Sequence, residues 1–497
     1  GDLQEGVCQE SLSLAGTLQL KKLIVLYDSN DVQLDGEVSM VNTENVRLKY
    51  EAMGFDYFLV EDGTDCDEIS AAIDAAKSSL KPSLIEIKTQ IGYGSPLAGD
   101  CSSHGAPLGQ ANTLELKEYL EWTYDEFEIP EECYEFYNKN VTVRGEKANT
   151  LFNKMLSEYQ DEYPDDYVEL EQYLNDDYVL DLSALRKYNL DFSEPTKNIS
   201  GHAIADISMQ LPFVVGGCAD VVNTTKARGS NGNYSVDNRV GRNIMYGVRE
   251  FAMGAIANAI TLYHGFRGFA GCFLVFSDYM KPALRLAALM KTPTVFTFSH
   301  DTIAVGEDGP THQPIEQLTM LRSIPNFNVI RSCDANETNY GYQIAFNSKT
   351  TPTAIITTRQ ALPTLPNTSY NLVAKGAYNV FTPSNEEDVV VVACGSEVHL
   401  ALDVAKELEQ AGVYVRVVSM PSMFLFDQQS DKYKETILPK DKKIIALEMG
   451  HPMCWYKYTP YVYGIDTFGE SGPAKAVLNK FGFTTEKFKG YVLKIIG

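Results

Sequence analysis

The sequence contains no apolar stretch long enough to cross a membrane. Its longest apolar runs, such as Val389–Cys394, have the length of a β-strand, whereas a membrane-spanning helix needs about 20 apolar residues. The opening residues Gly1–Gly6 lack the apolar segment of a secretory signal and are typical of the interior of a domain. We therefore expect neither a membrane partner nor secretion.

Paired cysteines and an excess of positive charge are also missing. The nine cysteines are an odd number, widely scattered and without a CxxC pair, which argues against a disulfide framework and a structural zinc site and favours a cytoplasmic location. The chain has 42 basic against 66 acidic residues, a formal net charge of −24. This charge argues against a nucleic-acid partner, because the phosphate backbone would be repelled. A small phosphorylated ligand would need a locally basic site.

A chain of 497 residues is long enough for two or three domains. Its first part alternates two kinds of segment: helix-like residues at Glu10–Leu20 and Asp67–Ser79, and strand-like residues at Leu23–Asp28 and Leu84–Lys88. This alternation predicts a parallel sheet covered by helices.

The composition changes between about Asn112 and Asp191, where acidic residues and tyrosines crowd together. We expect helical connecting structure with a solvated acidic face there, and a plain linker is an equal alternative.

Two further blocks of alternating elements follow, one from about Ile199 to Leu365 and one beginning near Asp388. The first has a long apolar helix after Arg249. The other expected elements are strands at Thr294–Ser299, Ala354–Thr357, Val389–Ala393, Val413–Ser419 and Lys443–Glu448, and a helix at Val398–Gln410. The predicted fold class is therefore α/β, with three consecutive α/β domains.

Two oxygen- and glycine-rich segments follow strands of the first block. Asn30 comes at the carboxyl end of a strand, where ligands of open parallel sheets collect, and an oxygen-rich turn there suits Mg²⁺. Taken alone, Asp28-Ser-Asn30 is more often a turn or a helix cap. The loop Lys88–Ser95 carries glycines whose backbone N–H groups could approach a phosphate, and His104 follows it.

An acidic residue and an aromatic series mark the second block. Glu250 opens an apolar helix, where an acid is favourable in any case. A semi-buried carboxylate can also share a proton with a ring nitrogen, because burial raises its pKa. Phe273, Phe276 and Tyr279 recur at three-residue spacing. Such a stripe is usually core, but it could also form a flat wall for an aromatic ring.

The densest run of polar chemistry is Ser299–Pro314, which holds two histidines and three acids after a buried strand. Histidines can donate to a developing alkoxide and pass protons. Arg359 ends a later strand, and its guanidinium suits bidentate contact with a phosphate.

Together these segments resemble the transketolases, enzymes that depend on thiamine diphosphate, over essentially the whole chain. The family carries Gly-Asp-Gly, then Glu-Gly, and later Tyr-Asp-x-Asn and Asp-Gly. Aligning on Glu5-Gly6 makes Gly1 the last glycine of Gly-Asp-Gly and places the family's metal-binding aspartate before residue 1. Asp2 is not that residue. The resemblance thus implies an N-terminal truncation within this motif.

The resemblance also implies a division of the chain. Its parts would be the remainder of a diphosphate- and Mg-binding domain (1–135), a helical connecting region (136–192), a pyrimidine-binding domain (193–370) and a C-terminal transketolase-type domain (371–497). The domains at 1–135 and 193–370 would both be parallel-sheet domains of the thiamine-diphosphate-binding type, and the one at 1–135 would be incomplete. The motifs of the C-terminal block, such as Gly395-Ser-Glu397, resemble the family but indicate no chemistry.

In the family match, Mg²⁺ (or Ca²⁺ or Mn²⁺) is held by the Asn30 side chain and the Val32 carbonyl. Glu250 would hydrogen-bond N1′ of the aminopyrimidine and stabilise the imino tautomer that deprotonates C2 of the thiazolium. The implied contacts of thiamine diphosphate are Gly1, Asn30, Val32, Ile91, His104, Asp220, Glu250, Phe273, Phe276 and Tyr279.

The same match implies catalytic roles for four residues and a wider set that binds the sugar. The implied catalytic residues are Glu250, His312, His300 and His104, and the implied substrate-binding residues are His104, Lys197, Thr224, His300, Asp308, His312 and Arg359. Asp308 would read the hydroxyl next to the acceptor's aldehyde. The sequence departs from the family at Lys197, where arginine is usual, and at Thr224, where serine is usual.

The expected activity is the reversible transfer of a two-carbon ketol group from xylulose 5-phosphate to ribose 5-phosphate or erythrose 4-phosphate in the pentose phosphate pathway. The family match implies a homodimer with active sites at the interface. Two alternatives stay open: a related thiamine enzyme such as dihydroxyacetone synthase, which Lys197 allows, or a non-catalytic subunit or fragment without the complete diphosphate motif.

Overall fold

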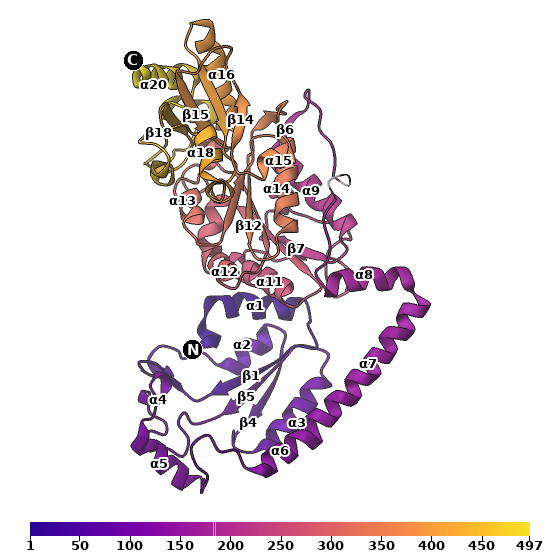
Figure 1. Cartoon of the computed structure of the whole chain (residues 1–497). Helices are drawn as coiled ribbons and strands as arrows, with labels where there is room; N and C mark the ends of the chain where they lie inside the picture. The colour runs from indigo at the N-terminus through magenta and orange to yellow at the C-terminus, as the bar shows by residue number, and fades with distance from the viewer. Residues whose placement is uncertain (182, 184) are drawn as a thin grey trace. The chain divides into compact units, whose positions relative to one another are not determined.

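The computed structural model describes residues 1–181, 183 and 185–497. They separate into two compact units, Gly1–Leu170 and Glu171–Gly497, and each unit is built on parallel β-structure (Figure 1). Within these described residues, no helix combines the length and the apolar character that a membrane span requires.

The first unit contains one small parallel sheet and a run of helices after it. Its elements are α1 (Gly6–Thr17), β1 (Ile24–Ser29), β2 (Val32–Gln33), β3 (Gly36–Glu37), α2 (Val46–Ala52), β4 (Asp56–Val60), α3 (Cys66–Lys77), β5 (Ser83–Lys88), α4 (Ser102–Gly105), α5 (Gln110–Tyr119), α6 (Glu131–Tyr137) and α7 (Val143–Glu162). Helix α8 (Pro164–Leu174) runs across the boundary between the units.

The sheet of the first unit has the strand order β1-β5-β4, with all pairs parallel. Successive side chains of β5 point to opposite faces of the sheet, and each face is covered by a different hydrophobic cluster. Leu84 packs with Ala15, Tyr50 and Phe55. Ile85 packs with Val60 and Ala76 on the α3 side. The sheet predicted from the helix and strand alternation is confirmed.

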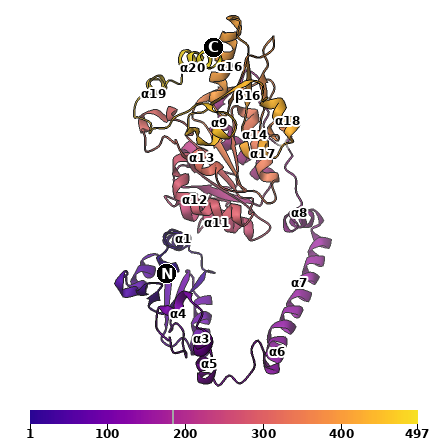
Figure 2. The same cartoon turned by 60° about the vertical axis from the view of Figure 1, so that its left-hand side comes forward.

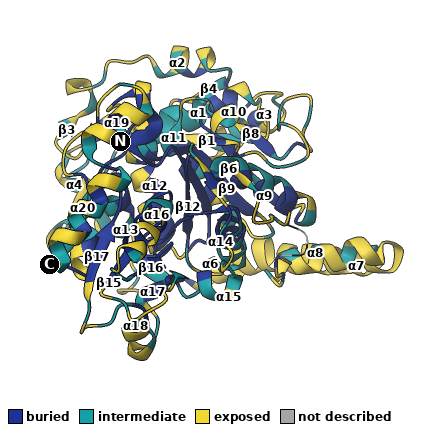
Figure 3. Ribbon diagram, turned by 90° about the horizontal axis from the view of Figure 1, so that it is seen from above, coloured by how far each residue is buried: buried dark blue, intermediate teal, exposed yellow. Residues whose placement is uncertain are grey.

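The acidic segment after this sheet forms helices. Figure 2 shows α7 as one long helix, and Figure 3 shows its residues almost wholly exposed. None of the α7 residues is buried. Helices α5 to α8, between Gln110 and Leu174, confirm the interpretation of this part of the segment as exposed helical structure over that of a plain linker. Residues 182 and 184 of the segment lie outside the described residues.

The second unit begins with a six-stranded sheet in which every pair is parallel. Its strand order is β11 (Asn328–Arg331), β12 (Thr353–Thr357), β10 (Val295–Ser299), β9 (Arg267–Phe273), β7 (Val214–Cys218) and β8 (Asn243–Met245). Helices α9 (Thr196–Gln210) and α14 (Ala335–Asn347) cover one face, and α11 (Glu250–Leu262) and α12 (Ser277–Leu289) pack together on the other (Figure 1). The shorter elements are β6 (Ser193–Pro195), α10 (Val222–Thr225), α13 (Gln317–Arg322), β13 (Ala361–Pro363) and α15 (Tyr370–Val373).

A five-stranded sheet follows, in which only the edge strand β14 is antiparallel. Its strand order is β14 (Tyr378–Phe381), β16 (Val415–Ser419), β15 (Val389–Ala393), β17 (Lys443–Leu447) and β18 (Tyr461–Tyr463). The associated helices are α16 (Glu397–Gln410), α17 (Met423–Asp427), α18 (Asp431–Ile437), α19 (Ala474–Phe481) and α20 (Thr485–Ile496).

The central strand β15 shows why its sequence is an unbroken apolar run. Val389 and Val391 belong to the core under α16 and α20, whereas Val390 and Val392 belong to the core that includes residues of α17 and α18. Because both faces of a parallel strand are covered, every position along it can be apolar. The strand predicted at Val389–Ala393 is confirmed with the same bounds.

The other predicted strands and helices are also present, with shifted ends. The predicted helix Glu10–Leu20 begins earlier, at Gly6, and ends at Thr17, before Gln19 adopts a left-handed backbone with φ of 46°. Helix ends depend on local caps more than on periodicity, so they are the least predictable part.

A buried cluster of charges joins the two sheets of the second unit. The Nε atom of Arg331, at the end of β11, lies 2.9 Å from Asp301 Oδ2. Its Nη2 lies 2.8 Å from Glu397 Oε2, and its Nη1 lies 3.2 Å from Glu448 Oε1. All four side chains are at most 1% exposed. Asp301 belongs to the loop after β10, while Glu397 and Glu448 belong to the C-terminal sheet and its helices.

Glu448 extends this cluster to a second arginine. Its Oε2 lies 2.6 Å from Arg322 Nη1 and accepts a hydrogen bond of 2.6 Å from Trp455 Nε1. Burial acts to raise the pKa of Glu448, but the charges of Arg322 and Arg331 prevail and lower it to about 2. The carboxylate therefore stays ionised.

We predict that Arg331→Leu lowers the free energy of unfolding of the second unit by about 3–5 kcal/mol, because removing one partner leaves buried carboxylates unpaired. Urea unfolding followed by the fluorescence of Trp455, which is fully buried, measures this in a Trp122→Phe background.

The matched control is Lys457→Leu, which removes an ion pair of 2.6 Å to Asp427 whose lysine is 61% exposed. We expect a change below about 1 kcal/mol for this variant. Equal losses in both variants would contradict a special role for the buried cluster.

Candidate active site

The implied site residues of the second unit gather at one edge of its six-stranded sheet. Most of them follow the carboxyl ends of parallel strands, which is where such sheets bind ligands, whereas Lys197 lies at the start of α9 after the short antiparallel strand β6. The residues and the strands they follow are Asp220 after β7, Glu250 after β8, Phe273 at the end of β9, His300 after β10 and Arg359 after β12.

Five rings form a continuous aromatic lining at this edge. The ring centroids of Phe273 and His300 are 3.9 Å apart, and those of Phe276 and His312 are 5.3 Å apart. Phe273 and Phe276 are nearly parallel at 6.0 Å, and Tyr279 continues the series at 6.1 Å. Exposure rises along it, from 9% at Phe273 to 65% at Tyr279. The stripe therefore lines a surface instead of filling the core.

His300 has an unusual backbone conformation and a strongly lowered pKa. Its φ of 64° lies in the left-handed region, which costs a residue with a side chain about 1 kcal/mol or more. Its Nδ1 lies 2.8 Å from Ser299 Oγ. Burial, and then the positive charges of Lys197, Arg359 and His312, lower the pKa of His300 to about 3. The imidazole is therefore neutral near pH 7, and its Nε2 is the nitrogen that can meet a ligand.

The loop that carries His312 is held by a buried glutamine. Gln313 Nε2 donates to the carbonyl oxygens of Ile303 at 3.1 Å, Gly306 at 3.0 Å and Glu470 at 3.0 Å. His312 Nδ1 lies 2.9 Å from Thr311 Oγ1. The sequence indicated no chemistry for the segment that contains Glu470. In the structure this segment helps to hold the loop that carries His312.

Positive charge collects at one end of this lining. Lys197 donates its backbone N–H to Thr358 O at 3.3 Å and its Nζ to Thr224 O at 3.0 Å. Arg359 Nη1 donates to Val305 O at 3.0 Å and lies 3.8 Å from Asp308 Oδ2. The structure therefore brings these predicted phosphate ligands together in a chain that is acidic as a whole.

Glu250 begins α11, where the partial positive charge of a helix N-terminus favours a carboxylate. Burial raises the pKa of Cys272, and the negative charge of Glu250 raises it further. Since Cys272 precedes Phe273 on β9, this electrostatic interaction places the carboxylate near the aromatic lining. A carboxylate next to a stacking wall fits a planar ring that carries a protonatable nitrogen.

The first unit contains a separate groove of about 850 Å³ whose lining includes Gly1, Asn30 and Val32. Asn30 Oδ1 accepts the N–H of Val32 at 3.1 Å, the geometry of an Asx turn. Amide and carbonyl oxygens are hard ligands, so this turn suits a magnesium ion in its chemistry. Ile91 is not in this lining, but its carbonyl oxygen accepts a hydrogen bond of 2.8 Å from the N–H of Gly99, which is. His104 is exposed on α4 and is not part of this lining.

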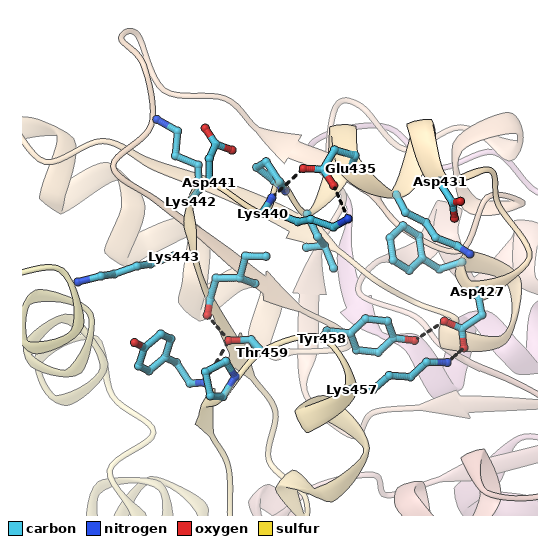
Figure 4. A pocket seen from close by; sticks show the side chains of 17 residues that line it. Asp427, Asp431, Glu435, Lys440, Asp441, Lys442, Lys443, Lys457, Tyr458 and Thr459 are labelled. Atoms are coloured by element: carbon cyan, nitrogen blue, oxygen red, sulfur yellow. Dashed lines mark hydrogen bonds and ion pairs between the residues drawn. The ribbon is translucent and has the colours of Figure 1, made fainter.

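Another cavity, of about 800 Å³, lies on the C-terminal domain beside α18, β17 and β18 (Figure 4). Lysines and carboxylates both line it, and two of these lysines form ion pairs with carboxylates of the same lining. Lys457 pairs with Asp427 at 2.6 Å, and Lys440 pairs with Glu435 at 3.7 Å. The residues that line it include neither histidine nor cysteine. This cavity therefore lacks the chemistry found at the sheet edge.

Comparison with protein families defines the class of this chain. Residues 1–178 match the transketolase thiamine diphosphate binding domain, 194–364 the transketolase pyrimidine binding domain and 376–484 the transketolase-like C-terminal domain. The fold is thus that of an α/β enzyme with thiamine diphosphate binding domains.

Individual relatives agree with these matches. A probable transketolase of Streptococcus pneumoniae is 46% identical over 98% of this chain and 75% of its own length. The transketolase of Bacillus subtilis is 44% identical over 100% of this chain and 76% of its own. The chain belongs to the transketolase family, transferases that move a two-carbon ketol group.

Solved structures show the same fold. A mutant transketolase from Pichia stipitis in complex with xylulose 5-phosphate has a TM-score of 0.96 at 36% identity, and the match covers 100% of this chain and 75% of that one. A transketolase from Leishmania mexicana has a TM-score of 0.96 at 35% identity and covers 99% of this chain and 74% of that one. The family and the α/β fold predicted from the sequence are confirmed.

Three residues near the site were not assigned a role from the sequence. Arg331 and Gln313 hold the loop between His300 and His312 in place, and the charge of Lys226 acts on Lys197. A signal existed for Arg331, since it is a charge at the end of the apolar run Val329-Ile330. Its partners, however, come from distant segments, and no local pattern connects them.

We predict that His300 does not titrate between pH 5 and 8, because burial and nearby cations keep its pKa near 3. NMR of protein labelled at histidine carbons, with the resonance assigned by its loss in His300→Asn, tests this. A chemical shift that follows a pKa above 5 would show that the ring is hydrated and can be charged.

Proposed function

We propose that the site at the sheet edge transfers a two-carbon ketol group from xylulose 5-phosphate to ribose 5-phosphate or erythrose 4-phosphate in the pentose phosphate pathway. The observation that carries this proposal is the combination of a neutral buried histidine, an aromatic lining and converging cations at one edge. It suits a sugar whose oxygens need hydrogen bonds and whose other end is a phosphate.

Thiamine diphosphate with Mg²⁺, or with Ca²⁺ or Mn²⁺, fits the donor set described above. The bound cofactor would supply the electron sink for breaking and forming the carbon–carbon bond. Glu250 would hold a proton at N1′ of the aminopyrimidine, and Phe273, Phe276 and Tyr279 would stack along the ring. The remaining proposed contacts are Gly1, Asn30, Val32, Ile91, His104 and Asp220, of which Asn30 and Val32 would bind the metal.

The sugar would lie between the histidines and the cations. Neutral His300 can donate or accept one hydrogen bond through Nε2, and with His312 and His104 it would meet the carbonyl and hydroxyl oxygens. Asp308, next to Arg359, would read the hydroxyl beside the aldehyde. Lys197, Thr224 and Arg359 would bind the phosphate, which requires positive charge in this acidic chain.

We infer a cytoplasmic homodimer with the active site at the subunit interface. Exposed apolar side chains on α12, including Leu286 at 43% and Leu289 at 65%, support a partner on this face. The nine cysteines are all free, which suits a reducing compartment. The alignment of Gly1 with the last glycine of Gly-Asp-Gly stays a prediction, as do the proposed domain boundaries.

The proposal predicts that xylulose 5-phosphate and ribose 5-phosphate are consumed only when thiamine diphosphate and a divalent metal are both present. A coupled assay for glyceraldehyde 3-phosphate measures the turnover. Turnover without the cofactor would refute the proposal. Turnover with unphosphorylated sugars alone would favour a related thiamine enzyme such as dihydroxyacetone synthase.

We predict that Glu250→Gln slows hydrogen–deuterium exchange at C2 of bound thiamine diphosphate by at least about 100-fold, because an amide cannot hold the N1′ proton. NMR of quenched samples measures the exchange. Glu316→Gln, an exposed acid at the start of α13, is the control and should exchange at the normal rate. Normal exchange in Glu250→Gln would mean that another group carries this proton.

A further inference from the structure

A third cation stands beside Lys197 and Arg359, and the mechanism above gives it no role. Lys226 caps the C-terminus of α10 in the left-handed region, with φ of 61°. Glycine or asparagine fills such a position at lower cost, because a Cβ atom is strained there. The backbone at this point therefore does not itself favour a lysine, and the case for the side chain rests on its neighbours.

The backbone around Lys226 is held against the helix that carries Lys197. A Cβ atom placed on Gly201 of α9 would lie 2.5 Å from the Lys226 Cβ and 2.9 Å from the Lys226 carbonyl oxygen. Only glycine permits this close approach. Lys197 lies four residues before Gly201, and residues so spaced share one face of a helix. The two lysines therefore emerge on the same side of α9.

A hydrogen bond links the two lysines from the other direction. Lys197 Nζ donates to the carbonyl oxygen of Thr224 at 3.0 Å, two residues before Lys226. The Lys197 N–H, in turn, bonds to Thr358 O at 3.3 Å, next to Arg359. Lys197 thus lies between the chain segments that carry the other two cations.

The three charges repel one another, and little in the protein offsets them. Burial lowers the pKa of Lys197, and the charges of Lys226 and Arg359 lower it further. Lys226 is exposed, and within residues 185–497 no carboxylate lies within ion-pair distance of it. Among the described residues, the only acid paired with Arg359 is Asp308, whose Oδ2 lies 3.8 Å from Arg359 Nη1. In a chain of net charge −24, such a cluster suits an anionic ligand.

We propose that Lys226 is a third phosphate-binding residue, which acts with Lys197 and Arg359 on the phosphate of the sugar substrates. The inference rests on the proposed function for the identity of that ligand. It also gives a reason for the departure at Lys197, because two neighbouring ammonium groups can together supply the positive charge and the donors that one guanidinium would supply.

Titration calorimetry of the full chain with ribose 5-phosphate, and with ribose as the unphosphorylated probe, tests this directly. We expect Lys226→Gln to weaken the binding of ribose 5-phosphate about tenfold, the usual effect of losing one charged hydrogen bond. Ribose should bind equally to both proteins. Lys226→Arg should restore the affinity for ribose 5-phosphate, and the difference should shrink at high salt.

The matched control is Lys291→Gln. Lys291 is also exposed and left-handed, with φ of 55°, but it precedes β10 at the opposite edge of the sheet. This variant should bind ribose 5-phosphate as the unchanged chain does, although it loses the same charge.

The outcomes separate the two proposals. An unchanged chain that does not prefer ribose 5-phosphate over ribose would overturn the phosphate site and the proposed function together. A clear preference that persists in Lys226→Gln would overturn the role of Lys226 alone. Equal weakening for both sugars, or weakening that Lys226→Arg does not restore, would also overturn it, because such a loss is structural.

Discussion

The buried guanidinium of Arg331 is the contact on which the second unit depends most. It binds Asp301 from the loop after β10, Glu397 from α16 and Glu448, which directly follows β17. Asp301 directly follows His300, whose backbone is strained. A strained residue persists only where its surroundings hold it. The ion cluster therefore fixes the loop that begins at His300 against the C-terminal domain. The sequence motifs of that domain resembled the family but indicated no such role.

The positive charges of the site have two effects, one on an anionic ligand and one on the pKa of His300. The cations that suit a phosphate also act on His300, because their charges add to burial in lowering the pKa of its imidazole. A neutral imidazole can both donate and accept a hydrogen bond, whereas an imidazolium can only donate. The same cluster thus attracts the anionic end of a substrate and keeps the neighbouring histidine in the form that can exchange protons. Neutralisation of the cations by a bound phosphate would relax this effect on His300.

Much of the fold was predictable because its signals are local. The apolar run at Val389–Ala393 and the alternation around Leu84–Lys88 each lie within one element, and parallel sheets covered on both faces leave such patterns in the sequence. Most of the candidate site was also predictable, since residues after strand ends meet at one edge of the sheet. Helix ends were not, because they depend on caps and on single backbone angles such as that of Gln19.

The sequence by itself determined the family, the order and kind of the elements and the residue types at the sheet edge, because these are properties of short segments. Only the tertiary structure decided which distant residues meet. The close approach of Lys226 to Gly201, the three carboxylates around Arg331 and the low pKa of His300 depend on burial and on charges that act through space. Such quantities are set by distances between segments far apart in the chain, and no local pattern of residues records those distances.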